Sequence, residues 1–216
     1  MSIQIQKIGI IGVGTMGAGI AQIAIQSGHD VVLFDAKEGA AEQAQDKLAK
    51  TLNTLADKGK FSHEKAAEDI AHLSTAQQLE DLKDCDLIVE AIIENLEIKQ
   101  KLMQQLEGMI KPEAILASNT SSLSISAIAA NCKQPERVAG YHFFNPVPLM
   151  KVVEVIEGFN TRADIIEALT QLSTKMGHRP VKAKDTPGFI INHAGRAFGS
   201  EAYAILNENV TPFYDI

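Results

Sequence analysis

Short apolar runs and longer amphipathic segments alternate along the chain. The short runs, rich in isoleucine, valine and leucine, predict buried strands, and apolar residues spaced three and four positions apart predict helices. Strands are expected at 8–13, 31–34, 70–73, 86–91, 114–117, 137–141, 151–156 and 179–183, and helices at 16–25, 95–109, 124–131, 162–176 and 189–207. Because strands and helices alternate, we expect an α/β fold with a doubly wound, mostly parallel sheet.

Two segments depart from this alternation. Residues 37–71 are rich in alanine, glutamine, glutamate and lysine with a break at Gly59, which predicts an inserted pair of helices after the second strand. The turn around Thr186 marks a domain boundary, so that residues 1–186 form one domain. Residues 187–216 are too few to bury a core of their own. We expect them either to pack on the first domain or to begin a second, helical one.

Three glycines follow the first predicted strand in the spacing G-x-G-x-x-G. They are Gly12, Gly14 and Gly17. In a dinucleotide-binding turn, the first glycine permits the tight turn, the second lets the backbone approach a pyrophosphate, and the third lets the helix pack on the strand. The spacing therefore predicts a phosphate-binding turn.

A carboxylate and a helix start complete this pattern. Asp35 ends the second predicted strand, where it can accept hydrogen bonds from a ribose 2′-hydroxyl and would repel a 2′-phosphate. The helix start at Thr15 and Met16 offers free N–H groups to the phosphates. We therefore expect a Rossmann-type domain that binds NAD rather than NADP. The alternative is a glycine-rich turn with a solvent-facing aspartate.

Composition narrows the class of partner. Of the 216 residues, 45% are hydrophobic and 22% are charged, and the formal net charge of −7 argues against nucleic acid as a partner. Cys85 and Cys132 stand far apart, so we expect neither a disulfide framework nor a zinc site, and a reducing cytoplasm suits them. The uncharged stretch 8–28 contains six glycines, so we expect a buried strand, turn and helix rather than a membrane or signal segment.

One carboxylate lies inside a strand that is apolar on both faces. Glu154 interrupts the run 152–156, and a buried carboxylate requires a partner because unpaired burial is costly. The nearest candidate is His142, which follows the preceding strand. We expect Glu154 to orient His142 and to stabilise its imidazolium form, as suits a general acid/base. The alternative is a solvent-facing Glu154 and an ordinary loop histidine.

Polar residues also follow two other predicted strands. Residues 118–122, Ser-Asn-Thr-Ser-Ser, lie at the carboxyl end of a buried strand, where ligands bind in open α/β sheets. The alternative for part of this cluster is a helix cap by Ser122 or Ser124. Glu94 and Lys99 flank the start of the next helix over the same crevice. The alternative for Glu94 is that it only favours a helix N-terminus.

Other polar groups are weaker candidates. Asn192 lies in an apolar helical segment, so it needs a hydrogen-bond partner or faces a cleft. The inserted helical pair carries Lys47, Lys50, Lys58, Lys60 and Lys65. These lysines suit the phosphates of a carrier such as coenzyme A or, because acidic residues are interleaved, an ordinary solvated face.

Five collinear segments together resemble the 3-hydroxyacyl-CoA dehydrogenase family. They are IGIIGVGTMG at 8–17, VEAIIENL at 89–96, ASNTSSL at 117–123, HFFNPVP at 142–148 and PGFIIN at 187–192. The resemblance implies NAD-dependent oxidation of an L-3-hydroxyacyl-CoA to the 3-ketoacyl-CoA. It extends to enzymes of the 3-hydroxybutyryl-CoA and 3-hydroxyadipyl-CoA type, in fatty-acid or phenylacetate-type metabolism.

The resemblance also implies residue roles. His142 would remove the hydroxyl proton, Glu154 would orient it, and Ser121 and Asn192 would hydrogen-bond the reacting oxygen. The cofactor-binding residues expected from the pattern and the resemblance are Gly12, Gly14, Thr15, Met16, Gly17, Asp35, Ala91, Glu94, Lys99, Asn119 and Asn145.

The family implies a homodimer formed through a C-terminal helical domain. The sequence ends soon after that domain begins, so we expect a truncated form of a dimeric parent. Two other functions stay open, which are a dehydrogenase of a 3-hydroxy acid without coenzyme A and a non-catalytic dinucleotide-binding protein. Retention of both His142 and Glu154 argues against the second, because a pure binder needs neither.

Overall fold

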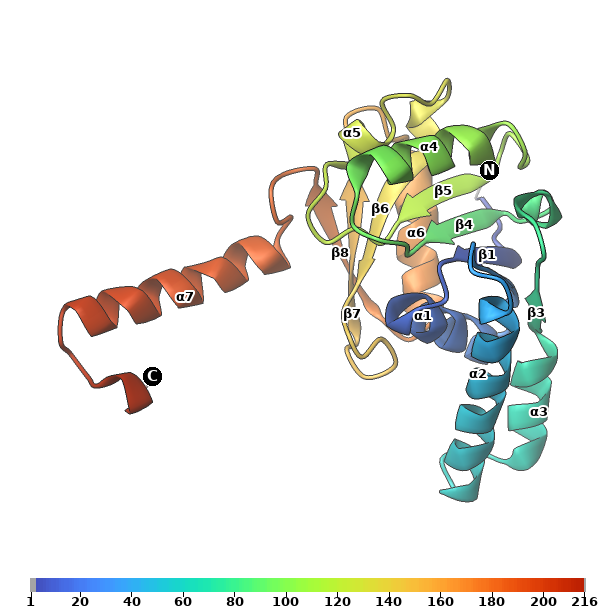
Figure 1. The fold of residues 1–216 in the computed structure, drawn as a ribbon, viewed down its shortest axis with the longest axis horizontal. Coiled ribbons are helices and arrows are strands. Elements are labelled where there is room, and N and C mark those ends of the chain that lie inside the picture. Colours follow the sequence, from blue (N-terminus) through green and yellow to red (C-terminus); the bar gives the residue numbers. More distant parts are fainter. Residues whose placement is uncertain (1–2, 216) are drawn as a thin grey trace.

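One eight-stranded sheet organises the chain, with strand order β3-β2-β1-β4-β5-β6-β7-β8 (Figure 1). The computed structural model describes residues 3–215, so residues 1, 2 and 216, at the ends of the two expected domains, lie outside it. The strands are β1 (Lys7–Ile11), β2 (Asp30–Phe34), β3 (Leu73–Thr75), β4 (Leu87–Glu90), β5 (Ile115–Ser118), β6 (Val138–Phe143), β7 (Val152–Glu157) and β8 (Arg179–Lys184).

Strands β1 to β6 run parallel, and β7 turns back antiparallel to β6. Strand β8 then runs parallel to β7. The chain order reverses between β1 and β4, so the carboxyl ends of these two strands flank the crevice where ligands bind in such sheets. The expected α/β fold with a mostly parallel sheet is confirmed.

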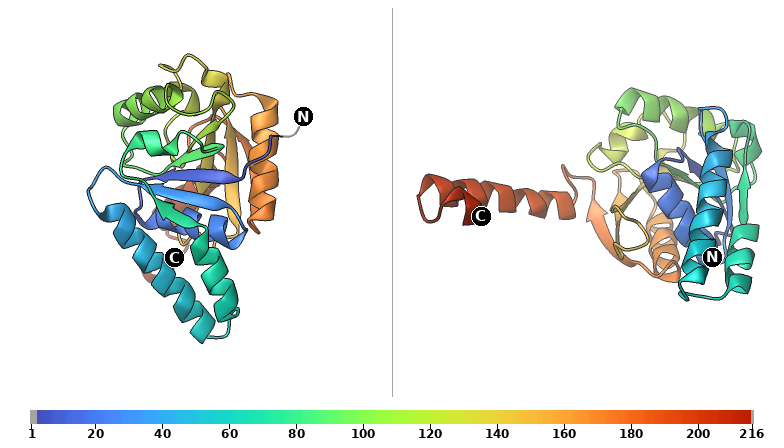
Figure 2. Two further views of the ribbon diagram at one scale, coloured as in Figure 1. Left: turned by 90° about the vertical axis from the view of Figure 1, so that its right-hand side faces the viewer. Right: turned by 60° about the horizontal axis from the view of Figure 1, so that its bottom comes forward.

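Helices cover both faces of the sheet (Figures 1 and 2). They are α1 (Thr15–Gln26), α2 (Ala40–Asp57), α3 (His63–Ala71), α4 (Leu96–Glu107), α5 (Ile125–Ile128), α6 (Ala163–Lys175) and α7 (Ile191–Asn207), with short 3-10 turns at Leu79–Leu82, Pro135–Arg137 and Phe213–Asp215. Helices α1, α2, α3 and α6 contribute to one apolar cluster, and α4 and α5 contribute to the other. Two covered faces explain why β4, β5 and β6 are buried along their whole length.

The inserted pair of helices is confirmed. Helices α2 and α3 lie side by side as an arm of the molecule (Figure 2), joined through Gly59 with a φ of 69°. Ser62 caps α3 by accepting a hydrogen bond from the Lys65 N–H. The positive φ and the cap together explain the break and the restart of helix.

A short strand follows α3, as expected, but the predicted bounds 70–73 are wrong. Residues Ile70 and Ala71 end α3, and β3 begins at Leu73, which pairs with Val31 of β2. The helical period of α3 therefore continues further than the apolar run suggested. The helix expected at 124–131 is also shorter, because α5 ends at Ile128.

Helix α7 extends away from the sheet and has no buried residue (Figures 1 and 2). Large apolar side chains on it are open to solvent, with Phe198 82% and Tyr203 77% exposed. Packing of α7 on the first domain is therefore not what the structure shows. Within residues 3–215, no helix is both long enough and apolar enough to cross a membrane.

Close approach of β6 to β7 requires a glycine at position 140. A Cβ added to Gly140 would lie 2.7 Å from Cβ of Ile156 and 2.8 Å from Cδ1 of Ile125. We expect Gly140→Ala to lower the free energy of unfolding by about 1–3 kcal/mol, because the core must shift to admit the methyl group. Urea denaturation monitored by circular dichroism measures the change.

The matched control is Gly195→Ala on α7, where an added Cβ has no atom within 4 Å. It should leave stability unchanged or raise it by up to about 1 kcal/mol, because alanine favours helix. An unfolding midpoint for Gly140→Ala equal to that of the unchanged protein would contradict this account of the β6–β7 contact.

Candidate active site

The glycine turn between β1 and α1 has the geometry expected from its spacing. Gly12 has a φ of 90°, and its N–H donates to the carbonyl of Phe34. A Cβ on Gly17 would lie 1.8 Å from the carbonyl oxygen of Gly12, so only glycine lets the helix sit this close to the turn. A Cβ on Gly14 would have no atom within 4 Å, which leaves its backbone open to a ligand.

Helix α1 presents its amino end at this open turn. Its N-cap, Gly14, has no side chain to accept from the first N–H groups. The backbone N–H groups of Thr15 and Met16 are thus available to an anion, while the Met16 side chain packs on the apolar core. These features fit the pyrophosphate of a dinucleotide.

Asp35 lies beside the same turn. Its carboxylate accepts hydrogen bonds from the N–H groups of Val13, at 3.0 Å, and Lys37, at 2.9 Å. Asp35 also lines a cavity of 660 Å³ together with Gly12, Gly14 and Ala91. This cavity is mostly apolar, with Ile92 and Leu102 among its walls, and it fits the adenosine half of NAD.

A second cavity, of 540 Å³, opens on the other side of Gly14. Gly14 and Thr15 form one wall of it, Lys47 of α2 lies on another, and residues 145–148 close it. Asn145 is exposed at this wall. The two cavities meet at the glycine turn.

Strand pairing brings His142 and Glu154 together. They are register partners in the antiparallel pair β6–β7, and Nδ1 of His142 lies 2.8 Å from Oε2 of Glu154. Glu154 is completely buried and His142 is 5% exposed. The expected pairing is confirmed, and the solvent-facing alternative for Glu154 is wrong.

The other oxygen of Glu154 binds the start of α7. Oε1 accepts from the N–H groups of Ile190, at 2.9 Å, and Ile191, at 2.8 Å. Phe189, with a φ of 49°, bends the chain just before these groups. Burial alone would raise the pKa of Glu154, but the hydrogen bonds from His142, Ile191 and Ile190 outweigh it and lower the pKa.

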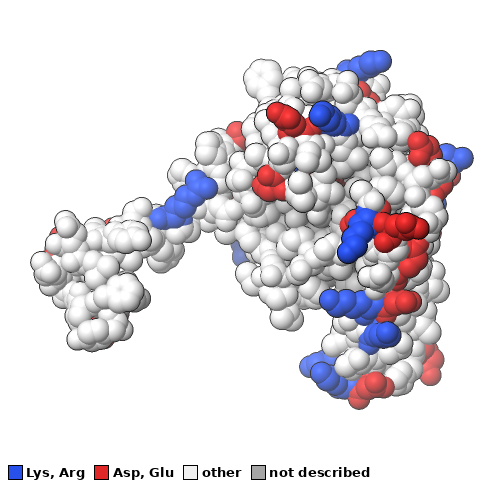
Figure 3. All heavy atoms as spheres, in the orientation of Figure 1, with Lys and Arg blue, Asp and Glu red and all other residues white. Residues whose placement is uncertain are grey.

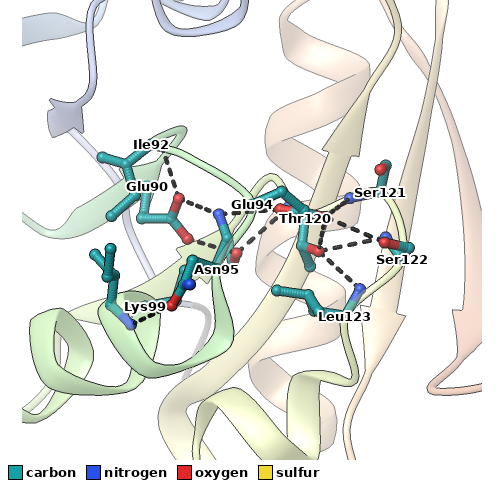
Figure 4. Close-up of polar contacts among 11 residues, drawn as sticks. Glu90, Ile92, Glu94, Asn95, Lys99, Thr120, Ser121, Ser122 and Leu123 are labelled. Atoms are coloured by element: carbon teal, nitrogen blue, oxygen red, sulfur yellow. Dashed lines mark hydrogen bonds and ion pairs between the residues drawn. The ribbon is translucent and has the colours of Figure 1, made fainter.

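Glu94 ties the β4–α4 loop to the polar segment after β5 (Figure 4). Oε1 accepts from Oγ1 of Thr120, at 2.5 Å, and from the N–H of Ser121, at 3.0 Å. Oε2 lies 3.3 Å from Nζ of Lys99. Burial opposes ionisation of Glu94, but the Thr120 hydroxyl, Lys99 and the Ser121 N–H together lower its pKa. Glu94 thus does more than favour a helix N-terminus.

Lys99 has a second, completely buried partner in Glu90 (Figure 4). Nζ of Lys99 lies 2.5 Å from Oε1 of Glu90. Glu90 also accepts from the N–H of Ile92, at 2.8 Å, and from Oγ of Ser118, at 2.6 Å. Glu90 is not among the predicted site residues, although it lies in an apolar strand as Glu154 does.

Two asparagines join the elements around this crevice. Oδ1 of Asn119 accepts from the N–H of Phe143, at 2.9 Å, and so ties the end of β5 to the residue after His142. This backbone contact of Asn119 was not foreseen. Nδ2 of Asn192 donates to the carbonyl of Ser121, at 3.0 Å, so the first turn of α7 contacts the polar segment after β5.

The cap of α5 also resolves an open alternative. Oγ of Ser124, not that of Ser122, accepts from the Ala127 N–H, at 3.2 Å. Asp185 supports this helix end by accepting from Ser124 Oγ and from the N–H groups of Ile125 and Ser126.

No group of three or more His, Cys, Asp or Glu side chains in residues 3–215 could hold a metal ion.

Glu154→Gln tests the shared carboxylate. The amide keeps the shape but cannot supply the charge that three donors stabilise, so we expect a loss of about 1–3 kcal/mol in stability at neutral pH. Because folding lowers the pKa of Glu154 below its ordinary value of 4.5, its stabilisation is present above that value and is lost as the pH falls through the folded pKa. The difference between the two proteins should therefore shrink in acid.

Denaturant titrations at pH 7 and at acid pH measure this difference. Glu167→Gln is the matched control, because Glu167 pairs with Lys182 on the surface, where both side chains are about half exposed. The control should change stability little at either pH. A Glu154→Gln protein as stable as the unchanged one at pH 7 would refute the role given to the carboxylate.

Known proteins are similar to this chain in both sequence and fold. The profile described as "3-hydroxyacyl-CoA dehydrogenase, NAD binding domain" matches residues 7–186. The 3-hydroxyadipyl-CoA dehydrogenase of Escherichia coli K12 is 44% identical over 210 residues, which cover 97% of this chain and 44% of that protein. The 3-hydroxybutyryl-CoA dehydrogenase of Clostridioides difficile is 42% identical over 204 residues, which cover 94% of this chain and 73% of that protein.

A crystal structure agrees with these relationships. The (S)-3-hydroxybutyryl-CoA dehydrogenase of Ralstonia eutropha superposes with a TM-score of 0.93 at 36% identity, over 99% of this chain and 75% of that one. The chain thus spans less than half of the E. coli relative and about three quarters of the other two. Its sequence and fold place the chain in the 3-hydroxyacyl-CoA dehydrogenase family, with the NAD-binding domain of that family over residues 7–186.

Proposed function

We propose that this chain carries the catalytic site for NAD-dependent oxidation of an L-3-hydroxyacyl-CoA to the 3-ketoacyl-CoA. One observation carries the proposal, which is the buried pair of His142 and Glu154 at the end of a dinucleotide-binding sheet. A histidine held by a buried carboxylate suits proton transfer, and a dinucleotide-binding protein without chemistry needs no such pair.

The cofactor would lie across the glycine turn. Its pyrophosphate would bind the backbone from Gly12 to Gly17, including the N–H groups of Thr15 and Met16. Asp35 would accept from the adenosine ribose, and Ala91 would line the same cavity. Towards the nicotinamide end, the remaining contacts would come from Glu94, Lys99, Asn119 and Asn145.

Glu154 fixes the direction of proton transfer. It holds Nδ1 of His142, so Nε2 is the nitrogen left to take the proton from the substrate hydroxyl. Bound NAD supplies the acceptor for the hydride from carbon 3. Carbon 3 loses a hydride and its hydroxyl loses a proton, which balances the conversion of an alcohol to a ketone.

Ser121 and Asn192 would stabilise the reacting oxygen. Ser121 would donate through its hydroxyl, while its backbone N–H is held by Glu94. Asn192 would donate through its side-chain amide, which already lies against the Ser121 carbonyl. Donors fixed in this way stabilise negative charge that develops on the substrate oxygen.

The acyl carrier would occupy the second cavity. Lys47 lies there on α2, opposite residues 145–148. Of the other lysines on the helical pair, Lys65 is held by Glu68 and Asp69. Figure 3 shows charges of both signs over α2 and α3, so attraction for the carrier phosphates would be local rather than spread over the arm.

The same proposal extends to domain organisation and location. Residues 1–186 would form the NAD-binding domain, and residues 187–216 would begin a helical domain through which the protein forms a homodimer. The solvent-exposed apolar side chains of α7 support that assembly. The two free, buried cysteines support a reducing cytoplasm.

An assay of acetoacetyl-CoA-dependent loss of NADH absorbance tests the proposal. The unchanged chain should turn over, and His142→Gln should lower kcat by at least about 100-fold, because general acid/base catalysis contributes about 10²–10⁴-fold. NADH binding, followed by fluorescence, should be largely kept. His72→Gln is the control, because His72 pairs with Asp30 at the amino end of β2.

Three results would count against the proposed function. Equal turnover of acetoacetyl-CoA and free acetoacetate would remove coenzyme A from the proposal. Loss of NADH binding in His142→Gln would show that the histidine binds the cofactor rather than transferring the proton. NADH binding without turnover of either substrate by the unchanged chain would contradict catalysis by this chain.

A further inference from the structure

A buried histidine outside the catalytic pair contacts the wall of the second cavity. His178 lies in the turn between α6 and β8 and is 3% exposed. Its Nε2 is 3.0 Å from the carbonyl oxygen of Val147, and its Nδ1 is 3.1 Å from the carbonyl oxygen of Met176. Both ring nitrogens thus face backbone acceptors.

Val147 belongs to the segment 145–148, which we call the cavity loop. Its side chain is 1% exposed and lies against α1, where a Cβ added to Gly19 would be only 2.9 Å from Cβ of Val147. The loop is therefore held on one side by helix α1 and on the other by the His178 ring. Within the loop, the Pro146 carbonyl accepts from the N–H groups of Leu149 and Met150.

The cavity loop leads directly from the catalytic strand to the second cavity. It follows His142 by three residues, and all four of its residues line the cavity opposite Lys47. The His178 ring also packs edge-on against Phe143, with ring centroids 5.6 Å apart. A displacement of this loop would change the cavity wall without touching the adenosine cavity around Asp35.

We propose that His178 is a positioning residue, whose N–H donation to the Val147 carbonyl holds the cavity loop in the shape that binds the acyl carrier. The assignment of the carrier to this cavity rests on the proposed function. The positioning itself rests on the contacts of His178 and Gly19 with Val147. A buried carbonyl that loses its donor pays the desolvation penalty of an unmade hydrogen bond, which favours movement of the loop towards water.

Two substitutions separate hydrogen bonding from packing. His178→Phe keeps a ring against Phe143 but removes both ring nitrogens, and with them the N–H that donates to the Val147 carbonyl. His178→Gln keeps one amide donor that can reach the Val147 carbonyl, and it also carries the test if the phenylalanine variant does not fold. His29→Phe is the matched control, because His29 is also almost fully buried, with its ring nitrogens 2.9 Å from Ser27 Oγ and 3.2 Å from Lys175 Nζ, but it does not line the second cavity.

Amide hydrogen exchange over residues 143–150 measures the loop directly and needs no substrate. In His178→Phe, exchange at Leu149 and Met150 should be about 10-fold faster, as follows from loss of one buried hydrogen bond. His178→Gln should fall between that variant and the unchanged protein, and His29→Phe should not change this peptide. Unchanged exchange in His178→Phe would overturn the positioning role, whatever reaction the protein catalyses.

Steady-state kinetics with acetoacetyl-CoA and NADH measure the consequence. His178→Phe should raise the KM for acetoacetyl-CoA about 10-fold, with kcat within about 3-fold of the unchanged protein. The Kd for NADH should rise less than this KM, because Asn145 is the only proposed cofactor contact within the cavity loop. Gly19→Ala, which pushes Val147 from the other side, should show the same pattern. An equal rise in the KM for acetoacetyl-CoA in His178→Phe and His29→Phe would indicate general destabilisation and refute a specific role of His178.

The two measurements also separate this proposal from the proposed function. Faster exchange with no turnover by the unchanged chain would retain the positioning of the loop but remove its connection with an acyl carrier. Turnover by the unchanged chain with no effect of His178→Phe on either readout would retain the enzyme and refute the role of His178.

Discussion

The burial of a charged carboxylate at position 154 constrains the rest of the site. Removing this charge from water is costly, and the cost is offset only if both oxygens keep strong donors. One oxygen of Glu154 is hydrogen-bonded to His142, and the other accepts from two N–H groups at the start of α7. Strand β6, strand β7 and the first turn of α7 must therefore hold fixed positions relative to one another.

The same physical requirement shapes the opposite side of the crevice. Glu90 is as completely buried as Glu154, and it is neutralised by Lys99 and bonded by Ser118. Lys99 in turn lies beside Glu94, which holds the backbone of Ser121. In the proposed reaction, Glu154 would position the group that takes the proton, and Glu90 would act through Lys99 and Glu94 on the serine that binds the substrate oxygen. In the proposed function, catalysis therefore depends on the order that these charges impose on the site.

Most of the fold follows from the sequence because the central strands β4, β5 and β6 are buried along their whole length and therefore read as continuous apolar runs. The spacing of Gly12, Gly14 and Gly17 likewise predicts the turn that joins β1 to α1. The pairing of His142 with Glu154 was predictable from one fact, which is that a charge inside an apolar strand needs a partner. The end of α3 at Ala71 was not predictable, because four residues are too few to distinguish the 3.6-residue repeat of a helix from the two-residue repeat of a strand. Contacts such as those of Asn119 with Phe143 and of His178 with Val147 depend on tertiary approach, which no local pattern encodes.

The most direct test of the central claim is the tautomer of His142. Nitrogen-15 NMR of histidine-labelled protein distinguishes a protonated ring nitrogen from an unprotonated one, and the spectrum of His142→Gln identifies the signals of this residue. If Glu154 holds Nδ1, the neutral ring must carry its proton on Nδ1 and leave Nε2 unprotonated. A neutral His142 protonated at Nε2 would contradict the account, because that nitrogen could not then accept a proton from the substrate.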